Sequence, residues 1–313
     1  MELELWADLS QAICDVRRGL APRPRDTHPT ATIVRVHLWA ALHDRPTAWA
    51  CDPDNWTAKT RPAPGLPDQS TMSRRTRRAD FDAFLALLQM RLRGRPAGGR
   101  LLAVRVVDGK PLELPNHTTD PNAAWGRGAS RTAVGYKLHA IWSADASTPD
   151  AFVVTPLDAC EKRMAFRMIT RVVVGGGAVG GYLLGDGHLD ASWLFDACRQ
   201  YSHQLLCPRA KPGTGLGHHY VSPDRRRAID LLEPPAGINA FGPTLHALRD
   251  GIERRFGNLT AFGGGLAALP PWVRRPWRVR RWVSAKLLVN AARIRRLNRR
   301  RREVTGEGKA IDA

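Results

Sequence analysis

The sequence predicts an α/β protein in which a mixed sheet is flanked by helices, with a helical N-terminal region and a basic helical C-terminal segment. Residues 1–95 carry apolar side chains at helical spacing, and residues 96–265 alternate short apolar runs with amphipathic stretches. Residues 266–313 interleave tryptophan with arginine and pass into an amphipathic helix. We therefore expect a helical N-terminal region, a sheet domain with a short insertion at 208–240, and a basic C-terminal segment.

Three helices are expected in the N-terminal region, at residues 6–20, 30–44 and 70–94. Ser70 or Thr71 can cap the third helix, because a hydroxyl oxygen accepts an otherwise unpaired backbone N–H. Its first turns are basic and its later turns apolar, so its N-terminal half can touch phosphate while the rest packs. A solvated arginine face on a structural helix is the alternative. The basic residues are Arg74, Arg75, Arg77 and Arg78.

The sheet domain is expected to hold six strands and three main helices. Gly109 allows a tight turn between the first two strands. Three closely joined strands followed by alternating strands and helices indicate a mixed sheet covered by helices. The strands are expected at 101–108, 111–115, 135–145, 152–159, 181–186 and 203–208. The helices are expected at 161–173, 190–202 and 243–262.

The chain is strongly basic, with 48 Lys and Arg against 29 Asp and Glu and a formal net charge of +19. This excess favours a polyanionic partner such as DNA or RNA, because each neutralised phosphate releases a counterion. A membrane-surface or ribosomal protein would fit the charge alone. No apolar run is long enough to span a bilayer, so no membrane association is expected. The five scattered cysteines lack a CxxC pair and indicate a reducing compartment, so we expect a cytoplasmic, nucleoid-associated protein.

Three acidic residues stand in informative positions: Asp108 and Asp186 end apolar runs, and Glu253 lies in a late helix. Carboxylates brought within 4 Å of one another repel by roughly 4 kcal/mol at an effective dielectric of about 20. Mg²⁺ or Mn²⁺ relieves this repulsion, and two such ions can hold the attacking and leaving oxygens of a phosphoryl displacement. Taken singly, the two aspartates are also ordinary turn residues, and the glutamate an ordinary helix ion pair.

Other polar residues near these acids have two interpretations each. Lys137 alternates with Tyr136 along a strand, so the two face opposite sides, and Lys137 either reaches phosphate or is a solvated strand lysine. For Asp120, in an Asp-Pro-Asn sequence, a loop-holding role is favoured over the metal site. For His188, a surface or core position is favoured over the cleft.

Five segments together resemble the DDE transposases of bacterial insertion sequences, in the group with the signature Tyr-x2-Arg-x3-Glu-x6-Lys. LLAVRVVDGKPL is similar to the strand of the first aspartate, and YLLGDGHLDASWLF to the strand and helix of the second. TTDPNAAWGRGASRTAVGYKLHAIWS resembles the segment that leads into Gly-Tyr-Lys-x-His, and LRDGIERRFGNLTAF the glutamate helix. LPDQSTMSRRTRR resembles the segment that precedes these domains. The resemblance runs over roughly residues 25–295.

The resemblance implies a ribonuclease-H-like core and metal-dependent cut-and-paste DNA strand transfer at terminal inverted repeats. Asp108, Asp186 and Glu253 would then be the catalytic residues and the ligands of two Mg²⁺ or Mn²⁺ ions. Arg249 would contact phosphate near the cleaved end, and the partners would be the inverted repeats and target DNA. Joining two transposon ends implies a homodimer on DNA.

Two signature positions depart from the pattern: His246 stands at the tyrosine and Thr260 at the lysine. The signature tyrosine and lysine would be expected to bind transposon-end DNA, so Thr260 lacks a positive charge for phosphate. Arg254 or Arg255 could supply that charge instead. The departures leave a catalytically decayed, transposase-derived DNA-binding protein as the alternative function. A nuclease on a related core, acting on RNA or other DNA, is a third possibility.

Overall fold

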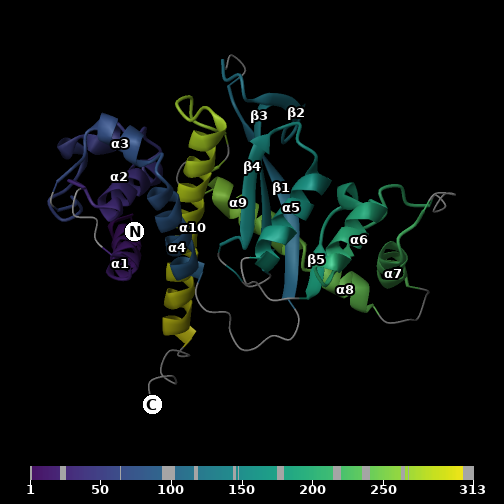
Figure 1. Ribbon diagram of the computed structural model, residues 1–313. Helices are drawn as coiled ribbons and strands as arrows, with labels where there is room; N and C mark the ends of the chain where they lie inside the picture. The colour runs from purple at the N-terminus through teal and green to yellow at the C-terminus, as the bar shows by residue number, and fades with distance from the viewer. Residues whose placement is uncertain are drawn as a thin grey trace. The chain divides into compact units, whose positions relative to one another are not determined.

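The computed structural model describes residues 2–21, 26–63, 65–93, 103–115, 119–143, 146, 148–174, 180–213, 220–234, 240–261, 265–266 and 268–305 (Figure 1). Parts of the expected insertion, at 214–219 and 235–239, and the tail from 306 lie outside these residues. The chain forms two compact units. We call Met1–Arg95, Leu259–Leu266 and Arg281–Ala313 the helical unit, and Pro96–Asn258 with Ala267–Arg280 the sheet unit.

The helical unit packs its helices around an aromatic core. Trp6, Trp39 and Trp56 form one cluster, in which the rings of Trp39 and Trp56 stack 4.8 Å apart. Salt bridges fasten the C-terminal helix to the first one, where Arg296 pairs with Asp8 at 3.0 Å. The elements of this unit are α1 (Glu2–Arg18), α2 (Thr30–Leu42), η1 (Trp49–Cys51), η2 (Pro53–Asn55), α3 (Gln69–Arg75), α4 (Ala79–Arg93) and most of α10 (Pro276–Thr305).

The single helix expected at 70–94 is in fact two helices, α3 and α4, separated by a turn after Arg75. Asp68, rather than Ser70 or Thr71, caps α3 and accepts a hydrogen bond from the Thr71 backbone N–H at 2.7 Å. Asp80, at the start of α4, lies 3.2 Å from Arg78. The break is therefore held by polar contacts that the apolar periodicity does not reveal.

The sheet unit contains a six-stranded mixed sheet with the order β2-β3-β1-β5-β6, in which β4 also pairs with β3. The meander β1, β3 and β4 is antiparallel, and β5 and β6 are parallel to β1. The strands are β1 (Ala103–Glu113), β2 (Ala124–Arg127), β3 (Thr132–Ser143), β4 (Ala151–Pro156), β5 (Gly181–Leu184) and β6 (His203–Leu206). A mixed sheet in an α/β fold is thus confirmed.

The expected turn at Gly109 is wrong, since β1 continues without interruption from Ala103 to Glu113. The reason is pairing along its whole length: β3 matches β1 from Arg105 to Glu113, which keeps Gly109 extended opposite His139. The short strand β2 was not expected from the sequence. The helix expected at 243–262 divides into α8 (Phe241–Ala247) and α9 (Asp250–Ala261).

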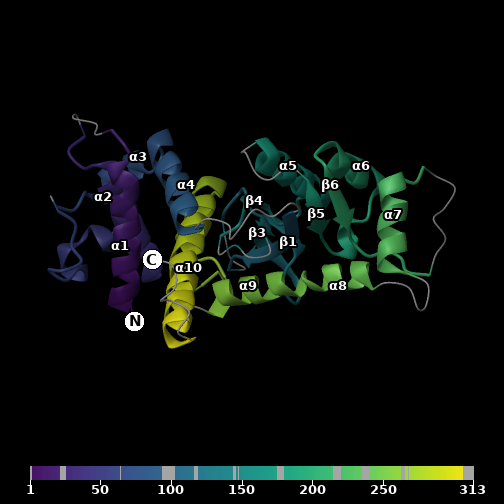
Figure 2. The same ribbon diagram turned by 90° about the horizontal axis from the view of Figure 1, so that it is seen from below.

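Helices cover both faces of this sheet (Figure 2). α5 (Glu161–Val174) and α6 (Ser192–Gln200) lie on one face, and α8 and the first part of α9 run along the other. α7 (Pro223–Leu232) lies next to β6, and the short helix η3 (Gly187–Leu189) follows β5. This arrangement places the start of α5, the end of β5 and the junction of α8 with α9 around the middle of β1. Across the described segments, no helix combines the length and apolarity that crossing a bilayer requires.

A buried polar network holds the sheet together near the N-terminal end of β1. Arg105 donates to Asp150 at 3.0 Å and to His203 Nε2 at 2.6 Å, and all three side chains are almost inaccessible to solvent. His203 in turn donates through Nδ1 to the Tyr201 carbonyl at 2.6 Å. The network ties β1 to β6 and to the residue that precedes β4.

Candidate metal centre

Asp108 and Asp186 reach the same small pocket because of the register between β1 and β5. The parallel pairing ends with Val106 opposite Leu184, and β5 stops there while β1 continues. Each aspartate stands two residues beyond this last pair. Both side chains line one pocket together with Glu161 from the start of α5. Two of the acids that the sequence singled out therefore converge, although Asp108 lies inside β1 and only Asp186 follows a strand end.

Asp108 is half-buried and held from two sides. Its Oδ1 accepts the Gly109 N–H at 2.7 Å, and its Oδ2 lies 3.8 Å from Nη2 of Arg249. Burial raises the pKa of Asp108, while the Gly109 N–H and Arg249 act in the opposite direction. The negative charge of Asp186 raises the Asp108 pKa further, and Lys137 lowers it. The pocket thus concentrates negative charge that a cation would stabilise.

Asp186 is a ligand candidate together with Glu161 and His188. Each of the three offers one ligand atom, and these atoms lie within 4.8 Å of one another. Ligand distances to a divalent ion are about 2.0–2.6 Å, so atoms this close can share one ion. His188 also donates through its backbone N–H and Nδ1 to the Asp186 carboxylate, at 3.1 and 3.0 Å. The donor set fits a divalent cation, and these residues form a possible acidic metal-binding triad.

Lys137 on β3 bonds directly to Glu161, which lines the same pocket. Burial lowers the pKa of Lys137, and the charges of Asp108 and Asp186 oppose that shift. Gly109 makes room for this side chain, since a Cβ at Gly109 would lie 2.6 Å from Cε of Lys137. The ammonium group is therefore one positive charge within reach of three carboxylates.

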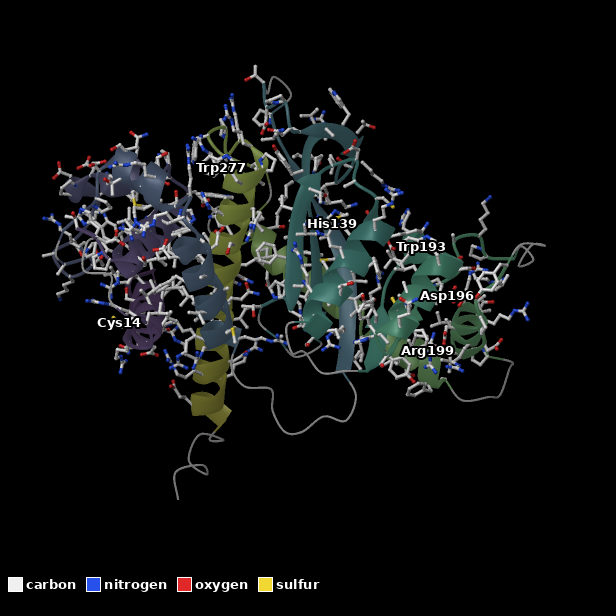
Figure 3. All side chains as sticks on the ribbon, viewed as in Figure 1. Cys14, His139, Trp193, Asp196, Arg199 and Trp277 are labelled. Carbon is white, nitrogen blue, oxygen red and sulfur yellow. The ribbon has the colours of Figure 1, made fainter. Side chains whose placement is uncertain are left out.

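His139 (labelled in Figure 3) lies on β3 and lines the same pocket. It is buried, and its Nε2 lies 2.9 Å from Oγ1 of Thr155. Burial lowers the pKa of His139 to about 4, so the ring is neutral near pH 7 and adds no charge to the pocket.

Glu253 lies exposed on α9, one turn after Arg249. It is not among the described residues that line the pocket. Its assignment as a third metal ligand stays a prediction. Arg254 is exposed beside it, whereas Arg255 donates to the Ser143 carbonyl at 2.9 Å and lies over the Trp142 ring. Arg254 is thus the more exposed of the two arginines, and contact of either with DNA stays a prediction.

His246, at the signature tyrosine position, contacts the segment that carries the second aspartate. Its Nε2–H donates to the Gly185 carbonyl at 2.9 Å. A tyrosine hydroxyl could donate in the same way, so this departure keeps a polar contact next to Asp186. Thr260 is half-buried on α9.

The four arginines of the N-terminal region fall into two pairs. Arg75 is buried and donates to the His28 carbonyl at 2.7 Å, and both Arg75 and Arg78 pair with Asp26. Both guanidinium groups are therefore held by contacts within the helical unit, and DNA contact by the four arginines stays a prediction. Arg74 and Arg77 are exposed and remain candidates.

Sequence reasoning missed Glu161 and ranked His188 as a surface or core residue. An acidic residue in the first turn of a helix is common, because it stabilises the helix dipole, so Glu161 gave no distinctive signal. For Asp120, the favoured loop-holding role is confirmed: it accepts from the Tyr136 hydroxyl and the Arg275 N–H, both at 2.7 Å.

Comparisons of the chain with protein-family models, with curated proteins and with solved structures gave no match.

Proposed function

We propose that this protein is a DDE-type DNA transposase, which hydrolyses and rejoins phosphodiesters at the ends of an insertion sequence. One observation carries the proposal: Asp108 and Asp186 line a single pocket at the level where β5 leaves β1. The five motif resemblances and the net charge of +19 support DNA as the substrate.

The strand arrangement supports a ribonuclease-H-like core for this activity. An antiparallel meander of β1, β3 and β4 is extended on the other side of β1 by β5 and β6, both parallel to β1. Helix α5 precedes β5 in the chain, and α6 lies between β5 and β6. The pocket opens beside the central strand, where side chains from several elements can meet.

The residues in and around the pocket would have different chemical roles. Asp108, Asp186 and Glu161, with His188, would hold one or two Mg²⁺ or Mn²⁺ ions. When bound, such ions lower the pKa of an attacking water or 3′-hydroxyl and stabilise the leaving oxygen. Arg249, whose Nη2 lies 3.8 Å from Asp108, would bind the phosphate oxygens, and Lys137 would add a second positive charge.

The direct test measures metal binding and DNA cleavage in the same variants. Asp108→Ala is expected to abolish end cleavage in Mg²⁺ and to weaken Mn²⁺ binding by calorimetry, while binding of end DNA in EDTA is retained. Asp196→Ala, on the half-exposed face of α6, is the control and should leave all three unchanged. Unaltered cleavage by Asp108→Ala would refute the assignment.

A second test compares the two candidates for the third acidic ligand. Glu161→Gln removes a carboxylate that lines the pocket, and Glu253→Gln one that is exposed on α9. If Glu253 is the third ligand, as the resemblance implies, only its substitution should stop cleavage completely. If Glu161 has that role, the outcomes are reversed.

The alternative function, a transposase-derived protein that binds DNA without cutting it, is favoured by the two departures at His246 and Thr260 and by the exposure of Glu253. A gel shift with intact inverted repeats beside a strand-transfer assay separates the two functions. Inverted repeats and short target duplications that flank the coding region would support transposition.

A further inference from the structure

The exposed side of α5 carries three arginines on one ridge. Arg163, Arg167 and Arg171 are spaced four residues apart, and all three are exposed. With a rise of 1.5 Å per residue, the ridge spans about 12 Å. Over that length, duplex DNA presents about seven phosphates.

These arginines have no acidic partner within the sheet unit as described. No carboxylate of the described residues lies within 4.0 Å of the three α5 guanidinium groups, nor of Arg280 near the start of α10. Two other arginines of the sheet unit do have acidic partners: the half-buried Arg209 pairs with Glu233 at 2.6 Å, and the exposed Arg227 with Asp224 at 3.4 Å. The ridge is therefore a concentration of unneutralised positive charge rather than an ordinary ion-paired surface.

The positive charges of the ridge also repel one another. Partial burial, and then the charges of Arg167 and Arg280, lower the pKa of Arg171. Like charges this close cost free energy in the protein alone, and a polyanion laid across them would remove that cost.

The ridge begins beside the candidate metal centre. Glu161 is the first residue of α5 and lines the pocket, and Arg163 follows two residues later. An aromatic contact borders the ridge: Phe166 meets the ring of Trp193, a half-exposed residue on α6 that is labelled in Figure 3, at a centroid distance of 6.4 Å. Arginine beside exposed aromatic surface is typical of nucleic-acid contact.

We infer that the α5 ridge of Arg163, Arg167 and Arg171, joined by Arg280, binds the phosphate backbone of the DNA that leads away from the metal centre. This deepens the proposed function and rests on it, since it names a second contact surface for the same substrate. The ridge binds backbone charge and carries no sequence preference of its own.

The test compares two double variants that remove the same charge from exposed helical positions. Arg163→Gln with Arg167→Gln alters the ridge, and Arg226→Gln with Arg227→Gln on α7 is the matched control. The probe is a fluorescein-labelled duplex of arbitrary sequence, titrated in EDTA at several salt concentrations. EDTA keeps the metal centre out of the measurement.

Each lost phosphate contact reduces the slope of log K against log salt by about 0.9. The ridge variant should therefore lose about 1.8 from the slope, which corresponds to roughly 60-fold weaker binding at about 0.1 M salt if the contribution vanishes near 1 M. The control variant should keep the slope of the unaltered protein. The ridge variant should also melt no lower than the unaltered protein, because it relieves repulsion.

The outcomes separate this inference from the proposed function. An unchanged slope in the ridge variant, or an equal loss in the α7 control, would overturn the ridge assignment alone. Absence of any DNA binding by the unaltered protein would overturn both. A reduced slope in the ridge variant, together with no end cleavage by the unaltered protein, would support the ridge assignment and refute the proposed transposase activity.

Discussion

Acid should destabilise the helical unit through His37, which lies in α2 and is almost fully buried. Its Nε2–H donates to the Arg281 carbonyl at 3.3 Å, and its ring meets Phe81 edge to face. Burial lowers the pKa of His37 to about 4, from an ordinary value of 6.5. Protonation would place a charge on the buried ring, so the folded state resists it.

The sign and size of the effect follow from proton linkage. Because the folded-state pKa is the lower one, the unfolded chain binds the proton first as pH falls below 6.5. The stabilisation is complete above the unfolded value and is lost as pH falls toward 4. Between about pH 7 and pH 5, this histidine alone should lower the free energy of unfolding by about 2 kcal/mol.

Urea unfolding at several pH values provides the assay, followed by near-UV circular dichroism of the stacked Trp39 and Trp56, which report on the helical unit. The comparison is with His37→Gln, whose amide can still donate to the Arg281 carbonyl but does not titrate. The variant should lose about 2 kcal/mol less than the unaltered protein over this pH range. An equal loss in both proteins would show that the His37 ring is not held neutral by burial.

Three further predictions concern single side chains. Asp150→Asn should destabilise the sheet unit by about 3–5 kcal/mol, because it leaves the buried Arg105 charge without its carboxylate; urea unfolding of the variant tests this. Gly109→Ala should cost under about 1 kcal/mol, because the new methyl meets only the flexible end of Lys137. It should also raise Mn²⁺ affinity about three- to tenfold by displacing the ammonium group from the metal centre, as measured by calorimetry. Arg75→Gln should destabilise the helical unit by about 3 kcal/mol in the same unfolding assay. When equal amounts of folded protein are compared, the variant should bind DNA as tightly as the unaltered protein, whereas loss of a phosphate contact would weaken binding.

The order of strands and helices around the sheet could be predicted because apolar runs and amphipathic stretches are local features. The errors occurred where pairing with a distant segment overrides local chemistry. Asp-Gly is a good turn sequence, yet Gly109 stays extended because β3 pairs with β1 on both sides of it. The third helix divides into α3 and α4 at Arg78, whose ion pairs with Asp26 and Asp80 depend on specific contacts and not on periodicity.

The candidate site shows the same division. Asp108 and Asp186 could be found from the sequence, because each comes at the end of an apolar run, although Asp108 proves to lie inside β1 and not at its end. Glu161 could not, since it stands among ordinary helix-starting residues and gains its role only from the packing of α5 over β3. Which arginines are buried and which are exposed could also be learned only from the fold. Arg74 and Arg75 are neighbours in sequence, but Arg75 is buried against Asp26 and Arg74 is exposed.

By itself, then, the sequence determined the fold class, the basic character and the two aspartates that share a pocket, because composition and periodicity are properties of neighbouring residues. Tertiary structure alone decided which third acid approaches those aspartates, which arginines lack an acidic partner among the described residues and which histidines are held neutral. Those properties depend on burial and on distances between residues far apart in the chain, and both come into existence only when the sheet and its covering helices assemble.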